Sequence, residues 1–235
     1  MQAVILAGGM GTRLKPLTDK IPKVMVPVNG KPFLWHLLKL LESQGIGDII
    51  LCIGYLGKQV KDFFGNGGSL GMRIRYSEET ERLLGTGGAL KQSQNLLDDH
   101  FFVINGDTYL PVDYEEVERS FMKRGKKALI VVYDNREHTG VRNNVELDDA
   151  LMVIRHDKES SDLSLEYVEA GVLAFKREVL DLMEQRGPVS IETGLYPTLI
   201  QQGELAAYVA GQRFYDIGTP SQQGIFEVFL ERRAR

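Results

Sequence analysis

A glycine-rich loop follows the first apolar run of the chain. Residues 2–7 have the character of a short buried strand, and they lead directly into Gly8-Gly-Met-Gly-Thr-Arg13. Glycines let backbone N–H groups approach phosphate oxygens, while Thr12 and Arg13 add a hydroxyl group and a permanent positive charge. The loop lacks the third glycine of the dinucleotide-binding fingerprint, and the chain has no Walker sequence. On this segment alone, a phosphate-binding loop and a plain glycine turn are equally consistent with the residues.

Two aspartates end apolar segments that lie far apart in the chain. Asp107 closes the triplet Asn-Gly-Asp after residues 101–104, and Asp216 opens the triplet Asp-Ile-Gly. Two converging carboxylates can hold Mg²⁺, because this ion uses few protein ligands and completes its coordination with phosphate oxygens. Either aspartate alone is more simply a turn or cap residue. A metal site therefore requires that both meet at one edge of the fold.

The single cysteine and the four histidines show no pattern of nucleophilic or metal chemistry. Cys52 lies inside the apolar run 48–54 without a basic neighbour, so we expect a buried strand thiol. One cysteine excludes a disulfide within the chain. The histidines have no metal-ligand spacing and are expected to be structural; they are His36, His100, His138 and His156.

The elements that position these residues alternate between strand and helix. Leucines at helical spacing over 34–41 follow Pro32 and stop at Gly45, as expected for a helix with a glycine cap. The alternation predicts a doubly wound α/β fold with parallel pairing and ligands at the carboxyl ends of the strands. The expected strands over the first 135 residues are 2–7, 49–53, 72–76, 101–104 and 128–133, and the other helices are 56–64, 87–97 and 112–123.

The pattern changes after residue 135. We expect short polar strands near 142–146 and 150–155, a mixed strand at 167–175, and helices near 177–185 and 191–201. A last helix begins at Thr219-Pro220, with Thr219 as its N-cap and Gln222 three residues later.

Composition describes an ordinary globular chain with one core. Of 235 residues, 43% are hydrophobic and 26% charged, and no linker-like stretch divides the chain, so residues 1–235 are expected to form a single domain. The net charge of −4 and the scattered basic residues argue against a nucleic-acid partner. The N-terminus resembles neither a signal peptide nor a membrane span, so we expect a cytoplasmic protein without a membrane partner. A homo-oligomer stays open.

The first loop, read further, is similar to the signature of the sugar-1-phosphate nucleotidyltransferases. That signature, GGxGTRLxPLT followed by Pro-Lys, corresponds to residues 8–18 and to Pro22-Lys23. The resemblance spans residues 2–230. The residues at the motif positions are most similar to those of the short heptose 1-phosphate guanylyltransferases, and next to those of the muramate 1-phosphate uridylyltransferases. Further matching segments are Leu84-Gly-Thr-Gly-Gly88, Asn105-Gly-Asp107, Thr139-Gly-Val141, Asp157-Lys158, Glu169-Ala-Gly171 and Tyr215-Asp-Ile-Gly-Thr-Pro220.

This resemblance implies a mostly parallel mixed sheet of the GT-A-like type. It also implies Mg²⁺-dependent transfer of a nucleoside monophosphate from a nucleoside triphosphate to a sugar 1-phosphate, with GTP and a heptose-like sugar favoured. Residues 1–135 would bind the nucleotide and residues 136–235 the sugar phosphate. The implied nucleotide-binding residues are Leu6, Ala7, Gly8, Gly9, Gly11, Thr12, Arg13, Glu79, Gly85, Thr86 and Gly106.

The resemblance also assigns individual roles. Arg13 would bind the β- and γ-phosphates, and Lys23 would lie between the α-phosphate and the sugar phosphate; with Asp107 these are the implied catalytic residues. A general base is not needed, because a sugar phosphate is already ionised at neutral pH. Asp107 and Asp216 are the implied metal ligands. The implied sugar-phosphate residues are Lys23, Gly140, Lys158, Glu169 and Gly171.

Base and sugar specificity are read from fewer residues. Glu79 could accept from guanine N1–H and the 2-amino group together, although Glu78 and Glu81 lie close by. Glu169 stands where the family commonly has asparagine, Asp157 where it has glutamate, and Glu159 where proline often follows the lysine. These departures leave the transfer chemistry intact and concern only the identity of the sugar.

Four other functions remain open at this point. One is a uridylyltransferase acting on a hexose or muramate-type 1-phosphate, and another is a cytidylyltransferase acting on a non-sugar phosphate. A third is a regulatory subunit that senses nucleotides without turnover. That subunit would be expected to have lost Arg13, Lys23 or one of the two aspartates, all of which are present. A nicotinamide-dependent dehydrogenase is disfavoured by the missing third glycine.

Overall fold

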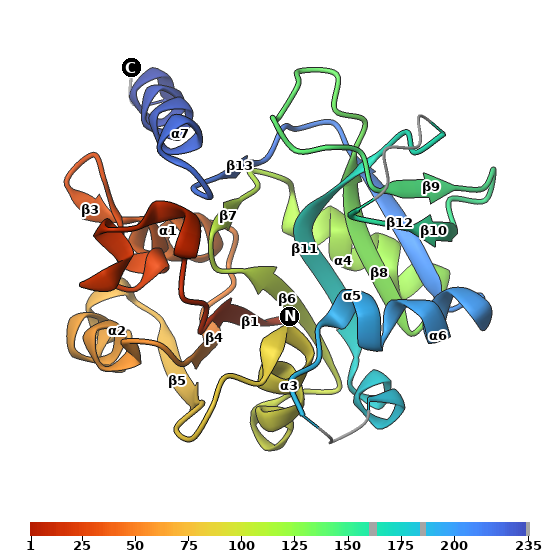
Figure 1. Cartoon of the computed structure of the whole chain (residues 1–235). Coiled ribbons are helices and arrows are strands. Elements are labelled where there is room, and N and C mark those ends of the chain that lie inside the picture. The colour runs from red at the N-terminus through yellow and green to blue at the C-terminus, as the bar shows by residue number, and fades with distance from the viewer. Residues whose placement is uncertain (160–163, 184–186, 234–235) are drawn as a thin grey trace.

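A seven-stranded mixed sheet runs through the computed structural model, which describes residues 1–159, 164–183 and 187–233. The strand order is β12-β8-β11-β6-β1-β4-β5, and every neighbouring pair is parallel except the two made by β11 (Figure 1). The predicted mostly parallel mixed sheet is therefore confirmed. Its strands are β1 (Gln2–Ala7), β4 (Asp48–Ile53), β5 (Arg73–Glu78), β6 (His100–Asn105), β8 (Ala128–Tyr133), β11 (Val168–Lys176) and β12 (Leu205–Ala210).

Helices cover both faces of this sheet. Because successive side chains of a strand point to opposite faces, Ala3 and Ile5 join one core while Val4 joins the other. The first core is closed by α1 (Phe33–Ser43), α2 (Gly57–Phe64) and α4 (Tyr114–Arg124). The second is closed by α3 (Gly85–Gln92), α5 (Ile191–Gly194) and α6 (Tyr196–Gln201). The sheet is thus doubly wound, as predicted.

Strand order reverses beside β1. From β1 the chain moves to β4 and β5 on one side, and β6 pairs with β1 on the other side. In open α/β sheets such a reversal leaves a crevice outside the carboxyl ends of the two strands. The glycine loop at residues 8–13 and the triplet at residues 105–107 leave the sheet at these two ends.

One pairing differs from the expected run of parallel strands. β8 does not lie beside β6, because β11 from the second half of the chain enters between them and is antiparallel to both. Nearly all residues of β11 are buried. A position inside the sheet, with a neighbouring strand on each side, buries its apolar side chains more completely than a position at the edge would.

Several elements after residue 135 are shorter than expected. The helix predicted at 177–185 is a 3-10 helix over Arg177–Leu182, and residues 184 and 185 lie outside the described part. The helix predicted at 191–201 is divided into α5 and α6 at Leu195, because Pro197 has no N–H to donate and favours a new first turn. The two short strands form a separate hairpin, β9 (Val145–Leu147) with β10 (Val153–His156).

Two further ladders and a last helix complete the fold. β2 (Pro27–Val28) pairs with β3 (Lys31–Pro32), and β7 (Thr108–Tyr109) pairs with β13 (Tyr215–Asp216). The β7–β13 ladder returns the C-terminal segment to the carboxyl edge of the sheet, and α7 (Pro220–Arg233) follows it (Figure 1). Within residues 1–159, 164–183 and 187–233, no helix is long and apolar enough to cross a membrane.

Candidate active site

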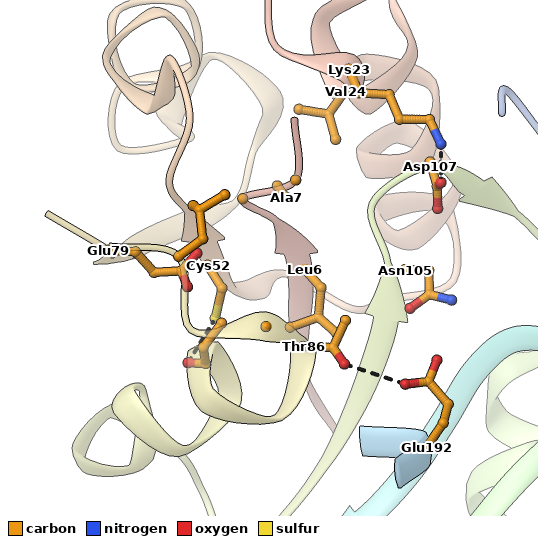
Figure 2. A pocket seen from close by; sticks show the side chains of 15 residues that line it. Leu6, Ala7, Lys23, Val24, Cys52, Glu79, Thr86, Asn105, Asp107 and Glu192 are labelled. Carbon is orange, nitrogen blue, oxygen red and sulfur yellow. Dashed lines mark hydrogen bonds and ion pairs between the residues drawn. The ribbon is translucent and has the colours of Figure 1, made fainter. Parts of the chain in front are cut away.

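A cavity of about 320 Å³ opens at the carboxyl ends of β1, β4 and β6, and we call it the first pocket (Figure 2). It contains the first residues of the glycine loop, Gly8 and Gly9, and the start of α3. Figure 2 shows Lys23 reaching Asp107 on one side and Thr86 facing Glu192 on the other. The lining residues are Leu6, Ala7, Gly8, Gly9, Lys23, Val24, Cys52, Glu79, Leu83, Gly85, Thr86, Ala89, Asn105, Asp107 and Glu192.

The second glycine loop, Leu84–Gly88, is pinned to a distant segment. The backbone N–H groups of Gly87 and Gly88 donate to the Val189 carbonyl, and Val189 N–H donates to Leu84. A Cβ on Gly85 would lie 2.5 Å from that carbonyl oxygen, at a backbone φ of +75°. Glycine is therefore required here for close backbone packing as well as for a positive φ.

The Glu79 carboxylate lies between the two glycine loops of the first pocket. One carboxylate oxygen accepts a hydrogen bond from Leu84 N–H at 2.6 Å, and the other would lie 2.4 Å from a Cβ placed on Gly8. Burial raises the pKa of this carboxyl, and the bond from Leu84 opposes that rise. The neighbouring Glu78 instead pairs with Lys61 of α2. Among the acidic residues near position 79, it is Glu79 that lines the pocket.

A second and larger pocket, of about 650 Å³, adjoins the first and shares Asn105 and Asp107 with it. It lies between β11, the loop at 138–144 and the β13–α7 junction. Of the five residues implied for the sugar phosphate, four line it: Gly140, Lys158, Glu169 and Gly171. The fifth, Lys23, lines the first pocket instead, and Asp216, an implied metal ligand, lines the second. Arg13 lines this pocket and not the first.

The two aspartates meet. Asp216 pairs with Thr108 in the β7–β13 ladder, and Ile217 N–H donates to the Asp107 carbonyl at 3.1 Å. Burial raises the pKa of the Asp216 carboxyl, and the charge of Asp107 raises it further. Gly218 N–H, Lys23 and Arg13 act in the opposite direction.

Both expected cations face the aspartates. Lys23 forms an ion pair with Asp107, and a Cβ on Gly218 would lie 2.8 Å from an Arg13 guanidinium nitrogen. No group of three or more histidine, cysteine or acidic side chains that could hold a metal occurs among the described residues. A cation at this edge would therefore rest on two carboxylates and on oxygens supplied by a substrate.

Lys158 is held across the boundary of the two pockets. It forms an ion pair with Glu192, whose other carboxylate oxygen accepts from the Thr86 hydroxyl at 3.4 Å. Burial lowers the pKa of Lys158, but the charges of Glu169, Glu192 and Asp107 outweigh it and the pKa is raised. For Glu192, burial acts to raise the pKa, because it disfavours the charged carboxylate. The charge and hydrogen bond of Lys158 outweigh this effect, so the pKa of Glu192 is lowered.

Glu169 is more constrained than its motif indicated. His156 contacts one carboxylate oxygen at 2.8 Å, and the Tyr196 hydroxyl donates to the other at 3.0 Å. The side chains of His156 and Glu169 are only 3% and 6% exposed. His156 thus has the structural role expected of the histidines, but in the wall of the second pocket.

A family model described as nucleotidyl transferase matches residues 2–231. The chain belongs to this family. It is 34% identical over 226 residues to the mannose-1-phosphate guanylyltransferase of Mycobacterium tuberculosis, covering 94% of this chain and 62% of that protein. Over 118 residues it is 43% identical to the D-glycero-alpha-D-manno-heptose 1-phosphate guanylyltransferase of Campylobacter jejuni, covering 50% of this chain and 52% of that one. The chain thus spans about three fifths or less of these curated relatives.

A solved structure is similar over nearly the whole chain. HddC from Yersinia pseudotuberculosis, crystallised in complex with GMP-PN, superposes with a TM-score of 0.83 at 29% identity. The match covers 97% of this chain and 99% of HddC. The GT-A-like nucleotidyltransferase fold inferred from the sequence is thereby confirmed.

Not every residue expected from the family motifs faces a pocket. Gly11 has a φ of +61°, and a Cβ there would lie 3.0 Å from the Cβ of Lys23. A Cβ on Gly106 would lie 2.6 Å from the Leu6 carbonyl oxygen. These glycines bring the chain close to itself, while Thr12 is exposed and lines neither pocket.

Asn105 and Glu192 are among the pocket-lining residues to which sequence reasoning assigned no role. Asn105 lines both pockets, and its place beside Gly106-Asp107 was a usable signal. Glu192 had no such signal, because it follows Lys158 by more than thirty residues and the contacts of Val189 and Ile191 with the start of α3 hold its segment in place.

Proposed function

We propose that this chain transfers GMP from GTP to a sugar 1-phosphate, heptose-like by preference, giving a GDP-sugar and pyrophosphate. The observation that carries the proposal is the meeting of Arg13, Lys23, Asp107 and Asp216 at one edge of the sheet. The printed names of the relatives support the class of reaction, since both name guanylyl transfer to a sugar 1-phosphate.

This reaction requires that the negative charge of the phosphates is neutralised and that the two substrates are accurately positioned. An oxygen of the sugar phosphate attacks the α-phosphorus of the triphosphate, the bond from that phosphorus to the bridging oxygen breaks, and pyrophosphate leaves. Two anions must approach, so their repulsion has to be offset by fixed cations. We propose that Lys23 binds the α-phosphate, and its position in the first pocket beside Asp107 supports this role. We propose that Arg13, which lines the second pocket near Gly218, binds the outer phosphates.

The two aspartates fit a hard divalent cation. Burial is the main cause of the raised pKa of Asp216 and the charge of Asp107 adds to it, so a cation between the two carboxylates would relieve their repulsion. We propose that Asp107 and Asp216 hold Mg²⁺, which prefers carboxylate oxygens and keeps its remaining positions for water and phosphate. When bound, the ion would neutralise charge that develops on the phosphates.

Lys158 is the proposed sugar-phosphate ligand on the opposite side. Its ammonium group is already oriented by Glu192, and it lines the same pocket as Gly140 and Gly171. Glu169 would contribute a carboxylate edge held in place by His156 and Tyr196. We assign residues 1–135 mainly to the nucleotide and 136–235 mainly to the sugar phosphate. Two residues are exceptions, because Arg13 lines the second pocket and Glu192 lines the first.

Guanine preference is assigned to Glu79. One oxygen is occupied by Leu84 N–H, and the other remains to accept from a guanine donor. The HddC complex with GMP-PN supports a guanine nucleotide as the substrate.

A substrate panel tests the proposal. The four common nucleoside triphosphates are each combined with heptose, mannose, glucose and N-acetylmuramate 1-phosphates and with phosphocholine, and pyrophosphate release is measured with Mg²⁺ and with EDTA. The expected result is turnover with GTP and a neutral sugar 1-phosphate, abolished by EDTA and restored by excess Mg²⁺. Turnover only with phosphocholine, or full activity in EDTA, would contradict it.

A further inference from the structure

Gln222, in the first turn of α7, reaches the carboxylate of Asp216. Its side-chain amide donates to one carboxylate oxygen of Asp216 at 2.7 Å, and Gly218 N–H donates to the other at 2.7 Å. Each oxygen of this carboxylate therefore has one neutral donor. Asp107 differs, because the cation Lys23 pairs with one of its oxygens, while the Thr108 hydroxyl lies 3.5 Å from the other.

The orientation of the Gln222 amide is itself fixed. The Thr219 hydroxyl donates to the Gln222 side-chain oxygen at 2.9 Å, and Gln222 N–H donates back to that hydroxyl at 3.3 Å. If the amide were reversed, the Thr219 hydroxyl could accept from the amide nitrogen, but the amide oxygen would face the Asp216 carboxylate and that contact would have no donor. The amide nitrogen must therefore point at Asp216.

This arrangement departs from the usual helix cap. Thr219 and Gln222 have the spacing of a capping box, in which the third helical residue reaches back to the backbone N–H of the N-cap. Here the glutamine side chain turns to Asp216 instead. A side chain that would otherwise serve only the helix is used to orient a carboxylate at the site.

We propose that Gln222 is a positioning residue for the cation that Asp216 helps to hold. The proposal rests on the metal site of the proposed function. A neutral donor fixes the direction of the carboxylate without cancelling the negative charge that a divalent ion needs. Groups that orient metal ligands in this way commonly contribute about 10- to 100-fold in metal affinity.

The neighbouring residue offers a matched control. Gln223 donates through its side-chain amide to the Pro27 carbonyl at 2.9 Å and to Glu227 at 3.2 Å, and it lines neither pocket. Methionine preserves the length and helix propensity of glutamine but cannot donate. Gln222→Met and Gln223→Met therefore remove the same group from adjacent positions, one facing Asp216 and one facing β2.

The test is direct binding of Mn²⁺, followed by the electron paramagnetic resonance signal of the free ion. Each protein is saturated with β,γ-imido-GTP, and the same analogue without protein is the blank. We expect the dissociation constant for Mn²⁺ to rise about 10- to 100-fold in Gln222→Met and to stay within about twofold in Gln223→Met. Melting temperatures of the two variants should be similar, since each loses one side-chain donor at the same end of α7.

The outcomes separate the two proposals. If the wild-type chain binds no Mn²⁺ beyond the blank, the metal site of the proposed function is wrong and this inference falls with it. If the wild-type chain binds Mn²⁺ and Gln222→Met binds it equally well, the inference is overturned while the metal site stands. Equal losses in both variants would also overturn it, because a structural weakening of α7 would then explain the effect.

Discussion

The two pockets are built in different ways, although they share a wall. The first is made of strand ends and glycine loops within residues 6–107, and among the later residues that the structure describes it is joined by Glu192 alone. The second takes its residues from segments scattered between Arg13 and Ile225, and ion pairs and hydrogen bonds between side chains shape it. Backbone-built surfaces suit the invariant part of a substrate, such as its phosphates, whereas side chains such as Glu79 in the first pocket and Lys158 in the second can discriminate its variable parts. We therefore expect the rate of the reaction to depend most on the shared wall, and substrate specificity to depend on the outer end of each pocket.

The largest effect is expected at the shared wall. Asp107→Ala removes a carboxylate from both pockets at a strand end and not from the core, so turnover should fall about 10²- to 10³-fold or more while the protein still folds. Pyrophosphate release and the thermal transition are the two measurements. Retained Mg²⁺-dependent pyrophosphate release in this variant would refute the assignment.

A smaller and one-sided effect is expected at Lys158. Lys158→Met removes a charged donor from the second pocket, and hydrogen bonds to charged groups contribute about 1.5–3 kcal/mol. The KM for the sugar 1-phosphate should therefore rise about 10- to 100-fold, while the KM for GTP changes little. Initial rates with each substrate varied in turn give both constants.

Lys123→Met is the control for that variant, because Lys123 is an exposed lysine of α4 that lines neither pocket. If the two Michaelis constants rise together in Lys158→Met, the division of labour between the pockets is wrong.

A change in selectivity for the nucleotide base is expected when Glu79, in the first pocket, is substituted. In Glu79→Gln the oxygen that accepts from Leu84 can be kept, but an amide N–H₂ replaces the second acceptor and would face guanine donors. We expect kcat/KM for GTP to fall about tenfold, with any turnover of UTP unchanged. The matched control is Glu78→Gln, which lies one residue earlier and pairs with Lys61. An unchanged preference among the triphosphates would dismiss the role of Glu79.

The smallest effect on turnover is expected at Cys52, on the floor of the first pocket. Burial raises the pKa of this thiol to about 12. A raised pKa leaves the neutral form dominant, so thiolate, and with it the rate of alkylation, should keep rising with pH through pH 10. An ordinary exposed thiol would level off near pH 9. Iodoacetamide labelling of the native protein followed by mass spectrometry measures this, and Cys52→Ala should alter turnover less than about twofold.

The sequence predicted most of the fold and of the first pocket for a physical reason. Glycine loops, strand ends and the Asn105-Gly-Asp107 turn are local features, so residues adjacent in the chain define them. The entry of β11 between β6 and β8 and the reach of Glu192 to Lys158 depend on pairings between distant segments. No local pattern records such pairings. Gln222 shows the intermediate case, because its spacing from Thr219 indicated a cap but not the target of its side chain.

The place of β11 has a consequence for how the chain acquires its shape during synthesis. When residues 1–135 have left the ribosome, the hydrogen-bonding edges of β6 and β8 that face β11 still lack their partner, which is more than thirty residues away. Unpaired edges of this kind invite association with other chains. The two halves are therefore expected to fold as one cooperative unit. A fragment ending at Tyr133 would lack the strand that pairs with both β6 and β8.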